Sequence, residues 1–169
     1  MERDAREPVA AVAVVEAPAD GPAVLLIRRP VRADDRWSGQ WAFPGGRRQT
    51  GDADLLATCH REAREECGLD LAAADAIALP PMLAGLGSAS PLLVAPFLVR
   101  LPRVPTLTLL AAEVDAVRWL PLAEFRDPAR HRRGVIADAG AQPHLPLDDV
   151  PLWGFTYRVL SAWLGSMSA

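Results

Sequence analysis

The sequence contains no lysine and no asparagine, so its eighteen strongly basic side chains are all arginines. These absences, beside abundant alanine and proline, suggest a GC-rich genome and say nothing about function. The formal net charge is −3, so the charge balance predicts no binding surface for duplex nucleic acid.

A long apolar run is also missing. The opening residues, MERDAREP, carry charges of both signs, and the apolar run after them is interrupted by Glu16 and Pro18. We therefore expect no signal peptide and no membrane-spanning segment, and we expect a cytoplasmic protein.

Cysteine is scarce. Cys59 and Cys67 fall on one predicted helix, about 12 Å apart at about 1.5 Å per residue, which is too far for a disulfide with each other. Their spacing fits no zinc motif, so we expect small buried core residues. A chain of 169 residues, half of them hydrophobic, is long enough to fold as one domain (1–169) without cross-links.

Apolar runs separated by turn residues predict an α+β fold in which helices cover a mixed sheet. Strands are predicted at residues 9–15, 23–28, 41–43, 92–101 and 114–120. Helices are predicted at residues 54–67, near the PLAEF segment (121–125) and at 151–164. Pro96 predicts an edge position or a bulge for its strand. Residues 127–149 are polar and rich in proline, which is typical of a long loop.

The first predicted helix carries closely spaced acids. Its core face consists of small or apolar residues, Leu55, Leu56, Cys59, Ala63 and Cys67. At about 100° per residue, Glu62, Glu65 and Glu66 occupy the adjoining edge, where like charges repel. A solvated helix with ordinary Arg–Glu pairs is one interpretation. A site for a divalent cation, Mg²⁺ or Mn²⁺, is the interpretation that explains the crowding.

The residues around this helix favour the cation site. Gly45 and Gly46 precede it and allow the backbone to approach an ion or a phosphate, with the Gly46 carbonyl as a further ligand. Arg61 lies four residues before Glu65, where it can neutralise and orient that carboxylate. Arg28 and Arg29 end a strand and are candidates for binding a phosphate.

The segment from Arg61 to Leu69, REAREECGL, together with the preceding PGG, resembles the signature of the Nudix hydrolases. This family cleaves nucleoside diphosphates linked to another group, in an α/β/α sandwich with a mixed sheet. This chain departs from the family signature in two ways. Asp52 replaces a glutamate, and eight residues, rather than seven, separate this acid from Arg61. Counting back along the helix from Arg61, Ala53 falls at the position of the family's glutamate. We therefore predict that Asp52 is the N-cap of the helix and supports the site structurally.

A narrower resemblance covers roughly residues 9–164. The segments GQWAFPGG (39–46) and WGFT (153–156) are similar to the branch of coenzyme A pyrophosphatases. This likeness implies that Phe43 and Gly45 contribute to substrate binding. The branch has a histidine where this chain has Trp37, which leaves open whether Trp37 and Trp41 stack on a base or pack beneath the loop.

The resemblance implies metal-assisted hydrolysis. Glu62, Glu65 and Glu66 would hold Mg²⁺ or Mn²⁺, with Glu65 orienting the water and Glu62 also counted as catalytic. Coenzyme A or an acyl-coenzyme A is the expected substrate, and 3′,5′-ADP and 4′-phosphopantetheine are the expected products. ADP-ribose or a dinucleotide is the alternative substrate, and a binding module without turnover is the alternative from another class.

Other residues and the assembly are less constrained. Glu113 precedes a strand, where related enzymes can place an extra acid. His60, His131 and His144 have no spaced partners, so we expect three surface histidines. The sequence does not decide the oligomeric state, and a homodimer is one of the states that it allows.

Overall fold

The computed structural model describes residues 7–35, 37–136 and 139–165. The described residues form a mixed sheet of eight strands in which β1 and β7 run parallel to each other. These strands are β1 (Ala10–Pro18), β2 (Pro22–Arg28), β3 (Trp41–Ala42), β4 (Gly45–Arg47), β5 (Ala76–Ala78), β6 (Met82–Ala84), β7 (Leu92–Arg100) and β8 (Ala116–Pro121). The predicted mixed sheet is confirmed, although β4, β5 and β6 are too short to leave a pattern in the sequence.

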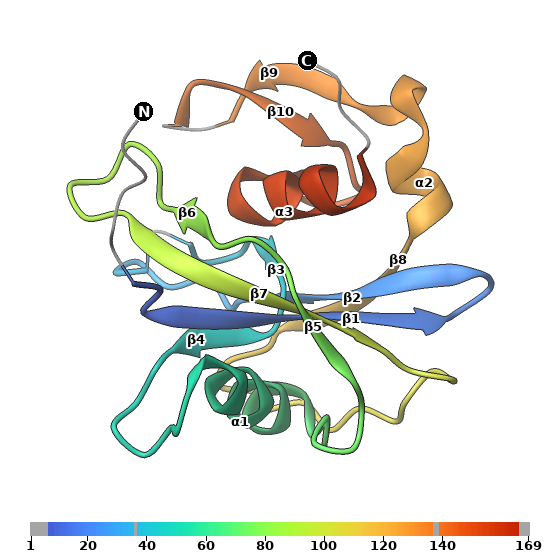
Figure 1. The fold of residues 1–169 in the computed structure, drawn as a ribbon. Helices are drawn as coiled ribbons and strands as arrows, with labels where there is room; N and C mark the ends of the chain where they lie inside the picture. The colour runs from blue at the N-terminus through green and yellow to red at the C-terminus, as the bar shows by residue number, and fades with distance from the viewer. Residues whose placement is uncertain (1–6, 36, 137–138, 166–169) are drawn as a thin grey trace.

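Helices cover both faces of this sheet, as Figure 1 shows. Helix α1 (Leu55–Cys67) packs on one face, and α3 (Gly154–Leu164) lies over the other. Side chains of β1 and β2 alternate between the two layers: Ala11, Ala13, Val15, Leu25 and Ile27 join the α1 core, and Val14, Val24 and Leu26 join the α3 core. This alternation is the period of two expected of a strand buried on both faces, and it confirms the α/β/α sandwich.

Pro96 predicts an edge position or a bulge for its strand, and the edge position is wrong, although the pairing on one side of the strand is interrupted at Pro96. Strand β7 is an inner strand, with β1 on one side and with β5 and β6 on the other. The carbonyl of Pro96 accepts a hydrogen bond from Leu79 N, which lies between β5 and β6. The C=O and N of one strand residue face the same side, so the N–H that proline lacks would also face the gap between β5 and β6. The proline is tolerated because no ladder bond is required there.

The predicted loop at 127–149 is also wrong, because most of its described part forms regular structure. After α2 (Leu122–Arg126) and a 3₁₀ turn (Pro128–Arg130), β9 (Arg132–Val135) and β10 (Ala141–Leu145) form a hairpin. Strand β11 (Leu152–Trp153) completes a small sheet beside α3 (Figure 1). Backbone pairing holds this sheet together, and its side chains, most of them exposed or only partly buried, give no apolar alternation in the sequence.

One histidine of this region is not the surface residue that we expected. The two ring nitrogens of His131 form hydrogen bonds with the Tyr157 hydroxyl at 2.7 Å and the Phe125 carbonyl at 2.6 Å. The His131 ring also packs edge-on against Phe125. The histidine therefore fastens the start of β9 to α2 and α3.

Helix α1 begins later than Asp52. Asp54 is the N-cap, with its side chain accepting a hydrogen bond from Ala57 N at 2.8 Å, so the prediction that Asp52 caps the helix is wrong. The extra loop residue lengthens the approach to the helix, and Asp52 turns inward instead. Gly68 ends the helix in a left-handed conformation, so the helix stops at residue 67, where its predicted range ends. None of the helices within the described residues combines the length and apolar character needed to cross a bilayer.

Candidate active site

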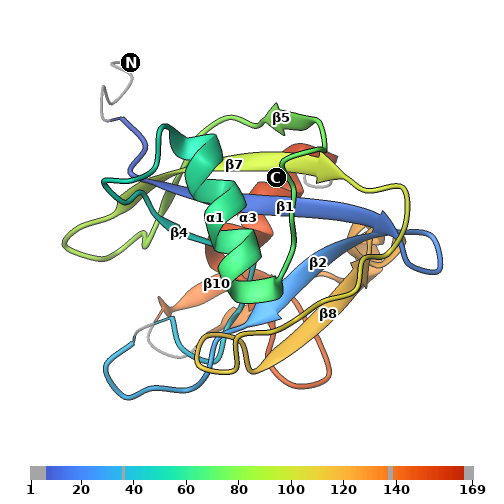
Figure 2. The same ribbon diagram turned by 90° about the horizontal axis from the view of Figure 1, so that it is seen from below.

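Small side chains bring α1 close to the sheet. Cys59, Ala63 and Cys67 are fully buried on the helix face that meets Ala11 and Ala13 of β1. Figure 2 shows α1 lying directly across this part of the sheet, beside β4. The acidic edge of the helix is thereby held against the backbone of β4.

Two glutamates face the double glycine of β4. The Glu66 carboxylate accepts a hydrogen bond from Gly45 N at 2.9 Å. A side chain at Gly46 would meet the Glu62 carboxylate, because an added Cβ would lie 2.7 Å from Glu62 Cδ. The absence of a side chain at Gly46 is therefore what gives the Glu62 carboxylate its position.

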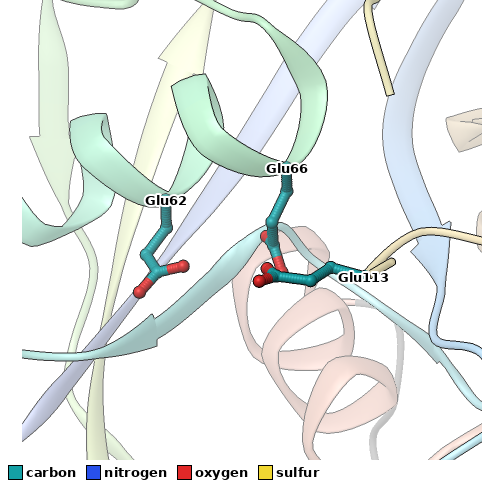
Figure 3. Close-up of side chains that lie close together, drawn as sticks. All are labelled: Glu62, Glu66 and Glu113. Atoms are coloured by element: carbon teal, nitrogen blue, oxygen red, sulfur yellow. The ribbon is translucent and has the colours of Figure 1, made fainter. Parts of the chain in front are cut away.

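A third acid approaches from a distant part of the chain. One ligand oxygen each of Glu62, Glu66 and Glu113 lie within 4.8 Å of one another, and Figure 3 shows the Glu113 carboxylate beside that of Glu66. Backbone bonds place Glu113: Leu110 N donates to Glu66 O at 3.1 Å, and Glu113 N donates to Leu110 O at 2.8 Å. The end of α1 thus fixes the turn that presents this third carboxylate.

Burial sets the charge state of the paired helix acids. Burial raises the pKa of Glu66 to about 8, and the neighbouring Glu62 and Glu113 carboxylates act in the same direction. The hydrogen bond from Gly45 N–H opposes this shift. Burial also raises the pKa of Glu62, although Arg61 opposes the shift. Three carboxylates in one partly buried cluster repel one another, so the cluster favours a bound proton or a cation.

Asp52 and Arg61 form a rigid support beneath the cluster. Arg61 Nε and Nη2 donate to the two carboxylate oxygens of Asp52 at 2.9 and 3.0 Å, and Thr58 Oγ1 donates to Asp52 at 2.9 Å. The paired hydrogen bonds from Arg61 hold the pKa of Asp52 well below its usual range. The same guanidinium donates to Glu62 at 2.8 Å and to Glu65 at 3.0 Å, so one arginine orients three carboxylates.

Glu65 lies beside the cluster rather than within it. Its side chain is 49% exposed and lines the same pocket as Glu62 and Glu66. The pocket has a volume of about 280 Å³, and its remaining lining residues come from three segments of the chain: Arg29, Pro30, Arg32, Asp35, Gly45, Gly46, Gln49 and Glu113. Glu65 is therefore the solvent-accessible member of the three helix acids.

The other predicted substrate residues divide between the pocket and the opposite layer. Arg29 lines the pocket and donates twice to one carboxylate oxygen of Asp35, at 3.1 and 2.9 Å. Arg28 points elsewhere, to Asp115 and Asp149. Phe43 is buried in the α3 core, so it supports the glycines that follow it and presents no surface to the pocket.

The two tryptophans of the Gly-Gln turn differ in exposure. Trp41 is buried, lies under Arg28 with 5.6 Å from the guanidinium carbon to the ring centre, and donates from Nε1 to Asp149 at 3.0 Å. Trp37 is 39% exposed. Packing is thus the role of Trp41, and stacking on a base remains an expectation for Trp37 alone.

Comparison with known proteins decides the family. A model of the NUDIX domain matches residues 6–139. The chain belongs to the Nudix hydrolase family. Most of the signature segment REAREECGL lies on α1, and it carries three of the acids that line the pocket, Glu62, Glu65 and Glu66.

Individual relatives agree with this assignment. The chain is 36% identical over 138 residues to an uncharacterized Nudix hydrolase NudL of Cronobacter sakazakii, covering 76% of this chain and 67% of that protein. It is 31% identical over 161 residues to an uncharacterized Nudix hydrolase NudL of Salmonella paratyphi B, covering 92% of this chain and 79% of that protein. An uncharacterized protein of Schizosaccharomyces pombe is 39% identical over 112 residues, covering 63% of this chain, which spans only 34% of that protein.

Solved structures show the same fold. A Nudix hydrolase from Alicyclobacillus acidocaldarius has a TM-score of 0.65 at 18% identity, covering 96% of this chain and 93% of its own. The NUDIX domain of Shewanella oneidensis NrtR, solved with ADP ribose, has a TM-score of 0.54 at 22% identity, and the match covers 73% of this chain and 80% of that domain. At these identities the likeness concerns the fold of the Nudix chain and not its substrate.

Sequence reasoning missed part of the pocket. The sequence offers Glu113 only as an extra acid before a strand, and no motif marks Arg32 or Asp35. The run RRPVRADD offered a signal, because charged residues spaced over a short loop after a strand often face the same site. The pairing of Arg29 with Asp35 could not be read from that spacing.

Proposed function

We propose that this protein hydrolyses nucleoside diphosphates linked to another group, with Mg²⁺ or Mn²⁺ as the cofactor. One observation carries the proposal: Glu62, Glu66 and Glu113 gather their carboxylates within 4.8 Å, beside two glycines and inside a pocket. The family to which the chain belongs supports the reaction class.

The residues present suit a hard divalent cation. Carboxylate oxygens are the ligands that Mg²⁺ and Mn²⁺ prefer. Burial, together with the neighbouring Glu62 and Glu113 carboxylates, raises the pKa of Glu66, and a bound cation would offset this mutual repulsion. Glu62, Glu65, Glu66 and the Gly46 carbonyl are the ligands that we assign, with Glu113 as an additional one. When bound, such ions neutralise phosphate charge and lower the pKa of coordinated water.

The residues of the pocket have separate roles in this reaction. Glu65 is exposed and held by Arg61 Nη1 at 3.0 Å, so its carboxylate is the group that we assign to orient the attacking water and accept its proton. Arg61 and Asp52 keep Glu62 and Glu65 in place. Arg29 contacts a phosphate, and Gly45 allows close approach of the substrate.

Coenzyme A or an acyl-coenzyme A is the substrate that we propose, with 3′,5′-ADP and (acyl-)4′-phosphopantetheine as products. The segments GQWAFPGG and WGFT, which are similar to the coenzyme A branch, support this choice. Trp37 in place of the branch's histidine favours a second candidate, another ADP-containing diphosphate such as ADP-ribose. The ADP ribose bound by the NrtR domain makes that compound a natural member of the test.

A substrate panel with detection of phosphate-containing products tests both candidates. Coenzyme A, acyl-coenzyme A, ADP-ribose and a dinucleotide are each incubated with Mg²⁺ and with Mn²⁺, using wild type, Glu66→Gln and the control Glu124→Gln. We expect cleavage of coenzyme A by wild type and by the control, and none by Glu66→Gln. Rapid cleavage of ADP-ribose without cleavage of coenzyme A selects the second candidate, and cleavage of none contradicts the proposal.

A further inference from the structure

The arginines near the pocket differ in how their charge is balanced. Arg61 is surrounded by Asp52, Glu62 and Glu65, and Arg29 is paired with Asp35. These guanidinium groups are already committed to carboxylates. Arg29 binds Asp35 through Nε and Nη2, so the phosphate contact assigned to it above falls to the rest of a guanidinium whose charge Asp35 already balances.

Arg32 is different. It lines the pocket, its side chain is exposed, and it has no carboxylate partner within ion-pair distance among the described residues. Its Nη2 donates to the backbone carbonyl of Ala112, across the pocket mouth and next to Glu113. A neutral carbonyl does not offset the positive charge, which acts on Asp35 only at longer range than an ion pair, and four further N–H donors of a guanidinium remain for other acceptors.

The backbone of Arg32 is nevertheless well fixed. Its carbonyl accepts hydrogen bonds from Asp35 N at 3.3 Å and from Ser38 Oγ at 3.0 Å. A firm backbone with an exposed, weakly held side chain allows the guanidinium to turn toward a ligand at little cost in ordering the loop.

We propose that the Arg32 guanidinium releases the Ala112 carbonyl and binds a phosphate of the diphosphate substrate. This inference rests on the proposed function and assigns the residue that recognises the diphosphate. The pocket is lined by five acids, Asp35, Glu62, Glu65, Glu66 and Glu113, so a polyanion requires cationic groups that those acids do not already hold. Arg32 supplies such a charge in the planar fork that suits phosphate oxygens.

A purely structural role is the competing explanation, in which Arg32 only clamps the turn before Glu113. Three substitutions separate the two roles. Arg32→Lys keeps the charge, Arg32→Gln keeps a donor for the Ala112 carbonyl without charge, and Arg32→Ala keeps neither. A clamp predicts that the Gln variant resembles wild type, whereas a phosphate contact predicts that the Lys variant is the better substitute.

Calorimetric binding of α,β-methylene-ADP, a diphosphate with a bond that is not hydrolysed, tests the proposal in the presence of Mg²⁺. We expect Arg32→Ala and Arg32→Gln to raise Kd by about ten- to a hundredfold, Arg32→Lys to raise it less, and binding of adenosine to stay unchanged in all three. Thermal midpoints should change by no more than about 2 °C, because the side chain is exposed. The control Arg100→Gln removes an arginine outside the pocket, paired with Glu16, and should bind like wild type.

This measurement separates the inference from the proposed function because it requires no turnover. Unchanged affinity of the diphosphate in Arg32→Gln, or no binding by wild type, overturns the role of Arg32 whatever the substrate panel shows. Weaker binding in Arg32→Ala and Arg32→Gln supports that role even if no substrate of the panel is cleaved.

Discussion

The two faces of the central sheet are built from residues of different size. Where α1 meets β1, the α1 layer buries small side chains such as Ala11, Ala13 and Ala63, and its large side chains such as Leu25 come from elsewhere. The α3 layer buries large side chains on the helix itself, such as Leu160 and Tyr157. Large side chains provide most of the apolar burial that stabilises a domain. Small ones allow a helix to approach the sheet closely, which is what brings the glutamates of α1 to β4.

The difference separates stability from chemistry. On the α1 face, repelling carboxylates lie in a partly buried cluster, which costs folding free energy unless a cation or a proton is bound. On the α3 face, His131 and Tyr157 satisfy each other by hydrogen bonding. Substitutions on the α1 face should therefore change activity first, and those on the α3 face should change stability first.

The largest expected effect is on turnover. Glu65→Gln and Glu66→Gln should each lower kcat at least about a hundredfold, because groups that act on the reacting phosphate contribute on that scale. Glu66→Gln should unfold at or above the wild-type temperature, since the amide carries no repelling charge. Glu65→Gln should unfold close to it, since it loses only a half-exposed ion pair with Arg61. Steady-state kinetics and thermal melts check this, with Glu124→Gln, outside the pocket, as the control. Near-normal turnover in both variants would contradict the metal site.

On the α3 face, Leu160→Ala should lower the free energy of unfolding by about 2 to 5 kcal/mol, as expected of a fully buried leucine. Turnover per folded molecule should stay within about twofold of wild type. Urea unfolding followed by circular dichroism gives the first quantity, and Leu86→Ala, at an exposed leucine, is the matched control. A loss of turnover as large as that of Glu66→Gln would erase the proposed separation of the faces.

Gly46→Ala should act on the site with little effect on stability. The added Cβ would displace the flexible end of Glu62, and misplacing a catalytic group by about 1 Å can lower turnover by about a hundredfold. We expect a loss of ten- to a hundredfold in kcat/KM, and a higher Mn²⁺ concentration for half-maximal activity. Gly51→Ala is the matched control because no atom lies within 4 Å of its added Cβ. Equal activity of the two variants would show that Gly46 does not position Glu62.

The smallest effect concerns pH without metal. Burial raises the pKa of Glu66 to about 8 from its ordinary value of 4.5, so between these values the folded protein retains a proton that the unfolded chain has lost. Stability from this group therefore falls as pH rises through that window, by at most about 1.4 kcal/mol per pH unit. Urea unfolding in EDTA from pH 5 to 8 should show a shallower fall for Glu66→Gln than for wild type. Parallel curves would mean that Glu66 titrates normally.

Sequence and structure agree best where local pattern dominates. The acids of α1 could be placed because a helical period of 3.6 residues and a spaced signature fix their relative positions. Glu113 could not be placed, because its position depends on backbone bonds from Leu110 to the end of α1. The inward turn of Asp52 likewise depends on Arg61 and Thr58, and Asp54 has the same N-cap preference as Asp52.

The central claim is that Glu62, Glu65 and Glu66, with the Gly46 carbonyl and with Glu113 as an additional ligand, hold the divalent cation of a diphosphate hydrolase. A crystal structure with Mn²⁺, analysed by anomalous scattering at the manganese edge, tests the claim most directly. The account predicts an anomalous peak bound by these carboxylates beside Gly46 and lost in Glu66→Gln crystals. A peak elsewhere, or none at saturating Mn²⁺, would contradict it.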